Sequence, residues 1–138
     1  MSEKIIKAVE EYFEFFNSQD AEGIAQLYAD NAKVTDPVGT PTKVGKEAIL
    51  SFYKLAVKNG ARLKRNGPIR ISQNFAAFAF TVSVGAMTSV DKDVAVEVEL
   101  PKGGMSIDVI DTFKFNEEGQ ITEMNAYWGP SNITHIYY

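Results

Sequence analysis

The sequence predicts an α+β fold in which three N-terminal helices pack on a curved antiparallel or mixed β-sheet and enclose an apolar, cone-shaped pocket. Up to about residue 58, hydrophobic residues recur at spacings of three and four, as in amphipathic helices. After Gly60 they alternate with polar or small residues, as in strands with one buried face. Helices followed by a run of strands are typical of an α+β domain. With 138 residues and no internal repeat, we expect one domain over residues 1–138.

Three segments predict the helices. The first has an apolar stripe that begins at Ile5 and includes Tyr12 and Phe16. The polar residues 17–20 interrupt this stripe, and Asp20 is a favourable N-cap for a second helix, which we expect to carry Tyr28 on its apolar face. The third helix is predicted over residues 46–58, with Tyr53 on its apolar side.

The remaining elements are predicted strands. Residues 34–36 are expected to be extended, because Pro37 disfavours a helical backbone at Asp36. Alternating patterns then predict strands within residues 69–72, 78–84, 94–100, 107–115 and 121–128. Turns are expected at residues 91–93, 101–104 and 116–119. The apolar residues 133–138 are suited to an edge strand or to covering a partner subunit.

The composition excludes several kinds of site. The chain has no cysteine and one histidine, His135, which excludes disulfides, thiolate metal sites, a histidine-based triad and a histidine zinc site. Its 14 basic and 18 acidic residues give a net charge of −4, which does not favour binding to nucleic acid or to an anionic membrane. Without a signal sequence or a long apolar stretch, we expect a cytoplasmic protein. Its chemistry is expected from carboxylates, tyrosines and lysines, with no metal or other cofactor.

Asp111 stands out among the acidic residues. Alternate residues of a strand face the same side, so Asp111 shares its side with Val109 and Phe113, whereas Asp108 lies on the more polar side. A carboxyl group on an apolar face is costly when ionised, so its pKa should rise, and the neutral acid can donate a hydrogen bond. A core aspartate paired with a cation or with backbone amides is the structural alternative.

Asp36 and Tyr12 are further candidates. Asp36 shares a face with Val34 and is placed to point into the mouth of the pocket, although aspartate before a Pro-x-Gly turn commonly serves the turn itself. Tyr12, Tyr28 and Tyr53 all lie on apolar helix faces, and each can equally be a core tyrosine. Three buried phenols can also form a hydrogen-bonded network that makes the last hydroxyl a better donor. A base with two neutral donors fits proton abstraction beside a carbonyl group.

These segments resemble the bacterial ketosteroid isomerases, within the wider nuclear transport factor 2-like and SnoaL-like superfamily. The stretch QDAEGIAQLYADNAKVTDPVG, which begins at Gln19, is similar to the segment that bears the base in that family, and GKEAILSFYK, which begins at Gly45, is similar to its third helix. The most specific likeness is IDVIDTFKFNEEGQITEMNAYW, with its Asp-x-x-Asp-x-x-Lys-Phe pattern and closing Tyr-Trp. The likeness runs from the first helix to Trp128 and implies a cystatin-like roll.

The resemblance implies a role for each candidate. Asp36 takes the place of the general base that carries a proton from C4 to C6 of a 3-oxo-Δ5 steroid, while Tyr12 and a protonated Asp111 match the oxyanion hole. The supporting residues that it implies are Tyr28, Tyr53 and Trp128, and the implied walls of the steroid cleft are Phe78, Phe80 and Met124. It also implies a small hydrophobic ketone, a steroid, as the substrate, and no cofactor.

Two features concern the surface of the protein. The chain is longer than those isomerases between Phe80 and Asp111, where it predicts an extended hairpin that can reshape the cleft entrance or a dimer face. We also expect a homodimer, because Ile110 and Tyr127 leave the outer side of the late strands apolar.

Other activities of the same fold remain alternatives. Scytalone-dehydratase-like chemistry needs paired histidines, which the chain lacks. Limonene-epoxide-hydrolase-like chemistry needs an Asp-Arg-Asp set, and the arginines of the chain, Arg62, Arg65 and Arg70, all lie close together in the predicted central strands. An isomerase or cyclase that acts on a non-steroid enone or polyketide stays open, as does a non-catalytic domain that binds small molecules.

Overall fold

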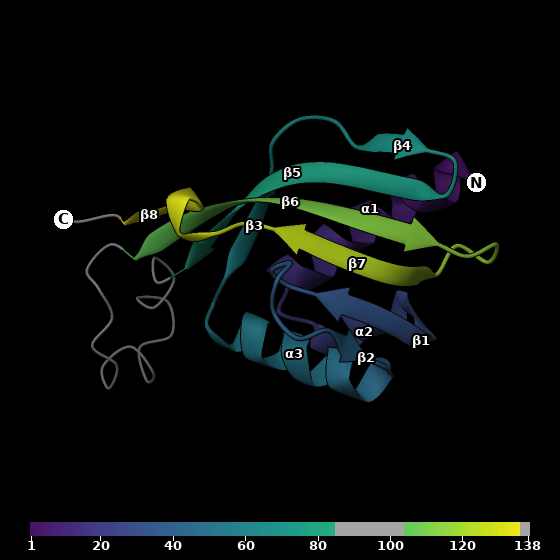
Figure 1. Cartoon of the computed structure of the whole chain (residues 1–138), viewed down its shortest axis with the longest axis horizontal. Coiled ribbons are helices and arrows are strands. Elements are labelled where there is room, and N and C mark those ends of the chain that lie inside the picture. Colours follow the sequence, from purple (N-terminus) through teal and green to yellow (C-terminus); the bar gives the residue numbers. More distant parts are fainter. Residues whose placement is uncertain (85–103, 136–138) are drawn as a thin grey trace.

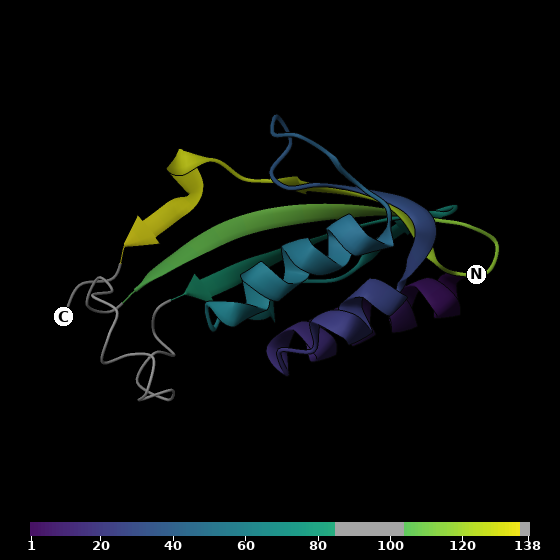
Figure 2. The ribbon, with the colours of Figure 1, turned by 90° about the horizontal axis from the view of Figure 1, so that it is seen from below.

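The computed structural model describes residues 1–84 and 104–135 and confirms the predicted α+β fold. Within these residues, three helices cover one face of a curved, unclosed eight-stranded sheet (Figure 1, Figure 2). The helices are α1 (Ser2–Asn17), α2 (Ala21–Gln26) and α3 (Lys46–Lys58). The strands are β1 (Tyr28–Thr35), β2 (Lys43–Val44), β3 (Arg62–Arg65), β4 (Arg70–Ser72), β5 (Phe75–Val84), β6 (Met105–Phe115), β7 (Ile121–Tyr127) and β8 (Ile133–His135). A 3₁₀ turn, Pro130–Asn132, precedes β8.

The sheet is mixed. Its strand order is β2-β1-β7-β6-β5-β3, with β1 parallel to β7 and the other neighbours antiparallel. The longest pairing joins β5 to β6, from Phe75 opposite Lys114 to Val84 opposite Met105. On its other side, β6 pairs with β7 along one part and with the short β8 near Met105. The C-terminal segment therefore adds an edge strand, as predicted, over Ile133–His135.

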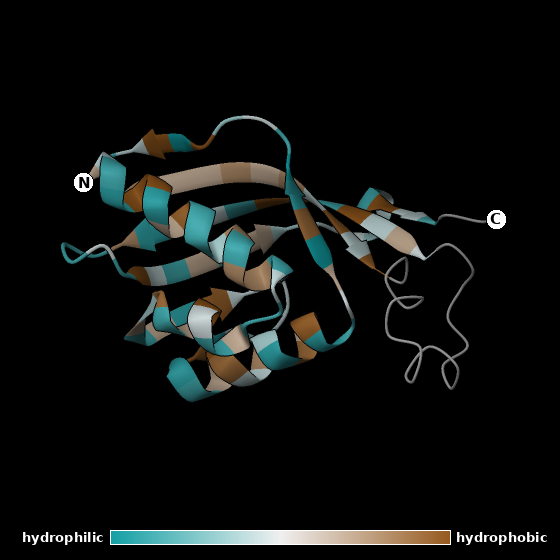
Figure 3. Ribbon diagram, turned by 180° about the vertical axis from the view of Figure 1, so that it is seen from behind, coloured by the Kyte–Doolittle hydropathy of each residue, from teal (hydrophilic) through white to brown (hydrophobic). Residues whose placement is uncertain are grey.

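Each long helix buries one face against the sheet. In α1 the buried residues are Ile5, Ala8, Val9, Tyr12 and Phe16, a spacing of three and four residues. Figure 3 shows hydrophobic and hydrophilic residues alternating along α1 and α3 from turn to turn. The Asn17 side chain fixes the end of α1 to β3, because it donates to the Leu63 carbonyl oxygen and accepts from the Leu63 N–H, at 2.9 and 2.7 Å.

The structure corrects the position of Tyr28. The helix pattern predicted that Tyr28 lies on α2, but α2 ends at Gln26, and Tyr28 is the first residue of β1. Pairing with β7 explains the difference. The Ile121 N–H donates to the Leu27 carbonyl oxygen at 2.9 Å, and Tyr28 lies opposite Ile121 in the parallel pair. The hydrogen bonds of the sheet therefore replace those of a further helical turn.

Two further predictions concern the edges and the long hairpin. Arg62, Arg65 and Arg70 were predicted in central strands, but they lie on β3 at the end of the strand order and on β4, which pairs only with β5 in the described chain. The predicted strand at residues 94–100, the turn at 91–93 and most of the turn at 101–104 lie outside the described residues. No helix in the described part of the chain is both long and apolar enough to span a bilayer.

Candidate active site

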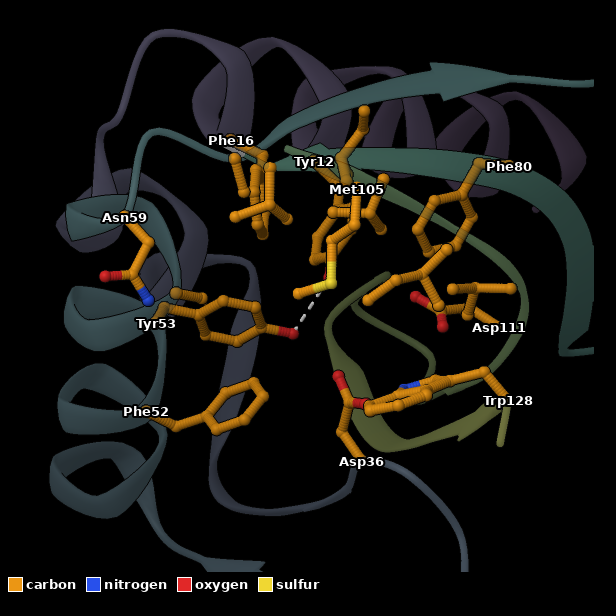
Figure 4. A pocket seen from close by; sticks show the side chains of 17 residues that line it. Tyr12, Phe16, Asp36, Phe52, Tyr53, Asn59, Phe80, Met105, Asp111 and Trp128 are labelled. Atoms are coloured by element: carbon orange, nitrogen blue, oxygen red, sulfur yellow. Dashed lines mark hydrogen bonds between the residues drawn. The ribbon is translucent and has the colours of Figure 1, made fainter. Parts of the chain in front are cut away.

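A cavity of about 320 Å³ lies between the helices and the concave face of the sheet (Figure 4). Apolar side chains make up most of its wall, from α1, α3, β3, β5 and β6. The polar or titratable side chains that line it are Tyr12, Asp36, Tyr53, Asn59, Asp111 and Trp128. Small-molecule sites are commonly of this kind, an apolar enclosure with a few polar groups that orient the ligand.

Asp111 lies on the inner face of β6, as its strand position predicted. It is 1% exposed, and its neighbours across the sheet are Phe78 on β5 and Ala126 on β7, both buried. Neither oxygen of its carboxyl group has a hydrogen-bond partner among the described residues. The paired core aspartate that was the structural alternative is therefore not found. Asp108 lies on the outer face, where it accepts a hydrogen bond from Thr81.

Burial determines the protonation of Asp111. Burial raises the pKa of this carboxyl well above its ordinary value of 3.8, and the nearby Asp36 raises it further. An ionised carboxylate without hydrogen bonds or a cation is very costly in such a place, so the neutral acid is the stable form. A neutral carboxylic acid offers one O–H donor to a ligand in the cavity.

Asp36 follows the last residue of β1 and is only partly buried, at the side of the cavity next to Trp128 (Figure 4). The indole Nε1–H of Trp128 donates to its Oδ1 at 2.8 Å. Partial burial raises the pKa of Asp36, while the Trp128 hydrogen bond and the charge of Lys43 lower it. Asp36 thus has two groups that favour its ionised form, whereas Asp111 has none among the described residues.

The three tyrosines form a hydrogen-bonded chain. The Tyr28 hydroxyl lies 2.6 Å from that of Tyr53, which in turn lies 3.1 Å from that of Tyr12. All three phenols are buried, and burial is the main reason why their pKa values lie well above 10.0. The network predicted from the sequence is therefore present. Tyr12 and Tyr53 line the cavity, whereas Tyr28 lies behind them.

The three residues predicted for the walls of the substrate cleft lie in different places. Phe80 lines the cavity, but Phe78 and Met124 do not. The rings of Tyr12 and Phe13 pack edge-on against Phe78 and cover it. Met124 is fully buried in the middle of the sheet, beside Val34 of β1 and Phe113 of β6.

Several lining residues were not predicted from the sequence. They come mainly from β5 and β6 and from the end of α3, namely Val82, Val84, Met105, Ile107, Val109, Phe52, Ala56 and Asn59. The alternation that singled out Asp111 also places Ile107 and Val109 on its face, so the same signal could have found them. Asn59 follows α3 and carried no such signal. His135 lies on β8, opposite Met105, and does not line the cavity.

Two kinds of site are not supported by this geometry. Arg62, Arg65 and Arg70 do not line the cavity, so the described residues do not place an arginine between Asp36 and Asp111 there. Within residues 1–84 and 104–135, no three His, Asp or Glu side chains come together as a metal site requires. The cavity therefore offers carboxyl and hydroxyl groups for proton transfer and hydrogen bonding.

Comparison with known proteins agrees with this geometry. Residues 9–124 match the SnoaL-like domain family. The chain belongs to the SnoaL-like family. It is 32% identical over 134 residues to the steroid Delta-isomerase of Nocardioides simplex, with 96% of both chains covered. The resemblance to steroid isomerases that the motifs predicted is thus confirmed.

Two other similar proteins are named for different activities. Over 128 residues the chain is 27% identical to the epoxide hydrolase LasB of Streptomyces lasalocidi. This alignment covers 86% of this chain and 45% of LasB. The fold also matches the solved structure of SalBIII, an epoxide hydrolase/cyclase-like enzyme with a role in pyran ring formation in the polyether salinomycin. The TM-score is 0.82 and the identity 23%, with 98% of each chain covered, which shows the common fold.

Proposed function

We propose that this SnoaL-like protein is a cofactor-independent isomerase that moves a proton next to a ketone, with a 3-oxo-Δ5 steroid as its substrate. The observation that carries the proposal is the pair of carboxyl groups in one apolar cavity with opposite surroundings. Asp36 is partly buried and hydrogen-bonded by Trp128, and Asp111 is buried with no partner in the described chain. Identity of 32% to a steroid Delta-isomerase supports the substrate class.

In the proposed reaction, Asp36 is the general base. Its carboxylate removes a proton from C4, between the carbonyl group and the double bond, and the electrons move toward the C3 oxygen to form a dienolate. Asp36 then returns the same proton to C6, which leaves a conjugated enone. The reaction begins and ends with Asp36 ionised, so no other acid, oxidant or metal is required. Its raised pKa makes Asp36 a stronger base than a free aspartate.

Tyr12 and Asp111 are proposed to hold the dienolate oxygen. Tyr28 donates to Tyr53 and Tyr53 to Tyr12 in the proposed direction of the chain, which leaves the Tyr12 proton for the substrate. The protonated Asp111 provides the second donor. Hydrogen bonds that are aimed at developing charge in a dry, apolar site stabilise the transition state more than they do in water.

A second candidate is opening of an epoxide, either by water or by a hydroxyl group of the same molecule. The likeness to an epoxide hydrolase at 27% identity favours it. In that reaction Asp36 takes the proton of the attacking hydroxyl, while the neutral Asp111 gives its proton to the epoxide oxygen. Both candidates need one ionised and one protonated carboxyl, so protonation alone does not separate them.

Steady-state assays separate the two candidates. We expect conversion of 5-androstene-3,17-dione to the conjugated enone, followed by its ultraviolet absorbance, and no cyclic ether from a hydroxy-epoxide such as 4,5-epoxypentan-1-ol. Equilenin, a planar analogue of the dienolate, should bind tightly to the same cavity. Ring closure of the hydroxy-epoxide without steroid isomerisation would favour the second candidate instead.

We also propose that the outer face of the sheet joins two copies of the chain. Ile110 and Tyr127 lie opposite each other on β6 and β7, and each is 50% exposed. Two apolar side chains on the open side of a sheet suit an isologous contact. Sedimentation equilibrium should give a dimer for the native protein and a monomer for Ile110→Lys, and a native monomer would contradict the proposal.

A further inference from the structure

Lys43, on β2, lies against Phe52 and acts electrostatically on Asp36, two residues that line the cavity, and no sequence pattern singled it out. In the antiparallel pair of β1 and β2, Lys43 is opposite Val34, so its side chain lies on the buried side of the pair, whereas the next residue, Val44, is 58% exposed. A hydrogen bond of 2.8 Å between the hydroxyl groups of Thr35 and Thr42 fixes the two segments just beside this position.

The ammonium group of Lys43 has a defined position. Its Nζ lies 4.8 Å from the centre of the Phe52 ring, a cation–π contact. Phe52 and Asp36 both line the cavity. In the described residues, Lys43 and Asp36 form no ion pair, so the cation acts on the carboxylate without touching it. This matters for a base, because a direct ion pair would occupy the oxygen that must reach the substrate.

The other groups that face Asp36 carry little charge. Asp111 from β6, Tyr12 from α1 and Tyr28 from β1 interact with it electrostatically. Burial raises the pKa values of all three, which favours their neutral forms. The contribution of Lys43 is a lowering of the Asp36 pKa. Lys43 is therefore the charged group in this set, and it favours the ionised form.

We propose that Lys43 is a positioning residue for Asp36, whose ammonium group, held over the Phe52 ring, stabilises the ionised carboxylate while leaving it open to the substrate. The role of Asp36 as a base rests on the proposed function, but the electrostatic effect of Lys43 does not. Lys43 is thus expected to set the lowest pH at which the base is available, and not the orientation of the substrate.

The direct test measures the Asp36 carboxyl in the free protein. Its pH titration is followed by ¹³C NMR in the native protein and in Lys43→Met, Lys43→Gln and Lys43→Arg, with Asp36→Asn to assign the signal. Methionine keeps an apolar side chain against Phe52 and removes only the charge. We expect the Asp36 midpoint to move to higher pH in the Met and Gln variants and to stay near the native value in the Arg variant.

Lys46→Met is the matched control. Lys46 pairs with Asp30 at 3.8 Å on the surface, so this variant removes the same charge from a nearby position outside the cavity. Its Asp36 midpoint should remain native. An unchanged midpoint in both Lys43→Met and Lys43→Gln would overturn the proposal, and so would an equal shift in Lys46→Met, which would indicate a general effect of net charge.

Activity gives a second, separate measurement. In Lys43→Met, kcat/KM should fall roughly two- to five-fold at pH values below the native midpoint, the size expected for one charge interaction near the protein surface. At alkaline pH it should equal or slightly exceed the native value, because Asp36 is then fully ionised and more basic. If the role of Lys43 were merely structural, the substitution would lower the alkaline plateau of kcat/KM and leave the midpoint of its pH profile unchanged. A shifted NMR midpoint without isomerase activity would contradict the proposed function and leave the Lys43 proposal standing.

Discussion

The two carboxyl groups of the cavity have the same chemical structure and opposite surroundings. Asp111 is held inside a regular strand, among buried apolar residues, with no hydrogen-bond partner in the described chain. Asp36 comes after the end of its strand, where Trp128 donates a hydrogen bond and Lys43 provides a positive charge. Burial raises the pKa of both, but by more at Asp111.

The difference in surroundings explains how one cavity can hold an acid and a base together. The middle of a β-strand offers a side chain no backbone donors, because these are used in the sheet, whereas a strand end leaves room for an indole or an ammonium group. In addition, each ionised carboxylate opposes ionisation of the other, so the less favoured one stays protonated. The following substitutions test that contrast.

Replacement of the base should have the largest effect. Asp36→Asn keeps the size of the side chain but cannot accept a proton, so kcat for 5-androstene-3,17-dione should fall on the order of 10²–10⁴-fold, the usual contribution of general acid–base catalysis. Asp30→Asn, an exposed position on the same strand, is the control and should keep native kcat. Near-native isomerisation by Asp36→Asn would show that another group is the base.

Replacement of Asp111 should distinguish a neutral donor from a base. Asp111→Ala removes the donor and should lower kcat on the order of 10²–10³-fold, as loss of an oxyanion-hole donor does. Asp111→Asn can still donate a hydrogen bond and should recover a large part of that loss, in contrast to Asp36→Asn. Asp108→Ala on the outer face is the control. Equal loss in Asp111→Asn and Asp111→Ala would argue against the donor role.

The buried Asp111 should also reduce stability in a pH-dependent way. Its pKa is raised in the folded protein, whereas in the unfolded chain it ionises at about 3.9. Above that pH the unfolded chain releases this proton first, so Asp111 makes the native protein progressively less stable as pH rises toward its folded pKa. Asp111→Leu should therefore gain more unfolding free energy at pH 7 than at pH 3, by about 1.4 kcal/mol for each pH unit between the unfolded pKa and either pH 7 or the folded pKa, whichever is lower. Urea titrations at the two pH values measure this, and an equal gain at both would contradict it.

The tyrosine chain should contribute the least. Tyr53→Phe removes the hydroxyl that contacts both Tyr12 and Tyr28. The loss in kcat should be roughly two- to ten-fold, the size of one net hydrogen bond, because Tyr12 itself remains. Tyr28→Phe, one step further from the cavity, should have a smaller effect on kcat. A larger loss in Tyr28→Phe than in Tyr53→Phe would mean that the chain does not end at Tyr12.

The sequence predicted those parts of the site that depend on regular patterns. Alternation along β6 correctly predicted that Asp111 and Asp108 lie on opposite faces of the sheet. Helical periodicity correctly predicted that Tyr12 and Tyr53 are buried. Tyr28 was placed on the wrong element because a local pattern cannot show that β7 pairs with the residues after α2. Between α2 and β1, pairing with β7 therefore decides the conformation of the chain, and local helix propensity does not.

Other features of the site follow from contacts between distant segments. Phe78 and Met124 have the residue types of a cavity wall, but neighbouring rings and strands cover them, and this depends on packing in three dimensions. Lys43 comes near Asp36 and Phe52 on a two-residue strand that is too short to leave a periodic signal. The lack of a partner at Asp111 can be seen only when all its neighbours are in place.

The most direct test of the central contrast is a ¹³C NMR titration of both carboxyl groups in one sample, with aspartate labelled at the γ carbon. The signals are assigned with Asp36→Asn and Asp111→Asn. We expect the Asp36 signal to report ionisation at the lower pH, while the Asp111 signal remains that of a protonated acid at pH 7. An Asp111 carboxyl that ionises near pH 4, before Asp36, would contradict the assignment of donor and base.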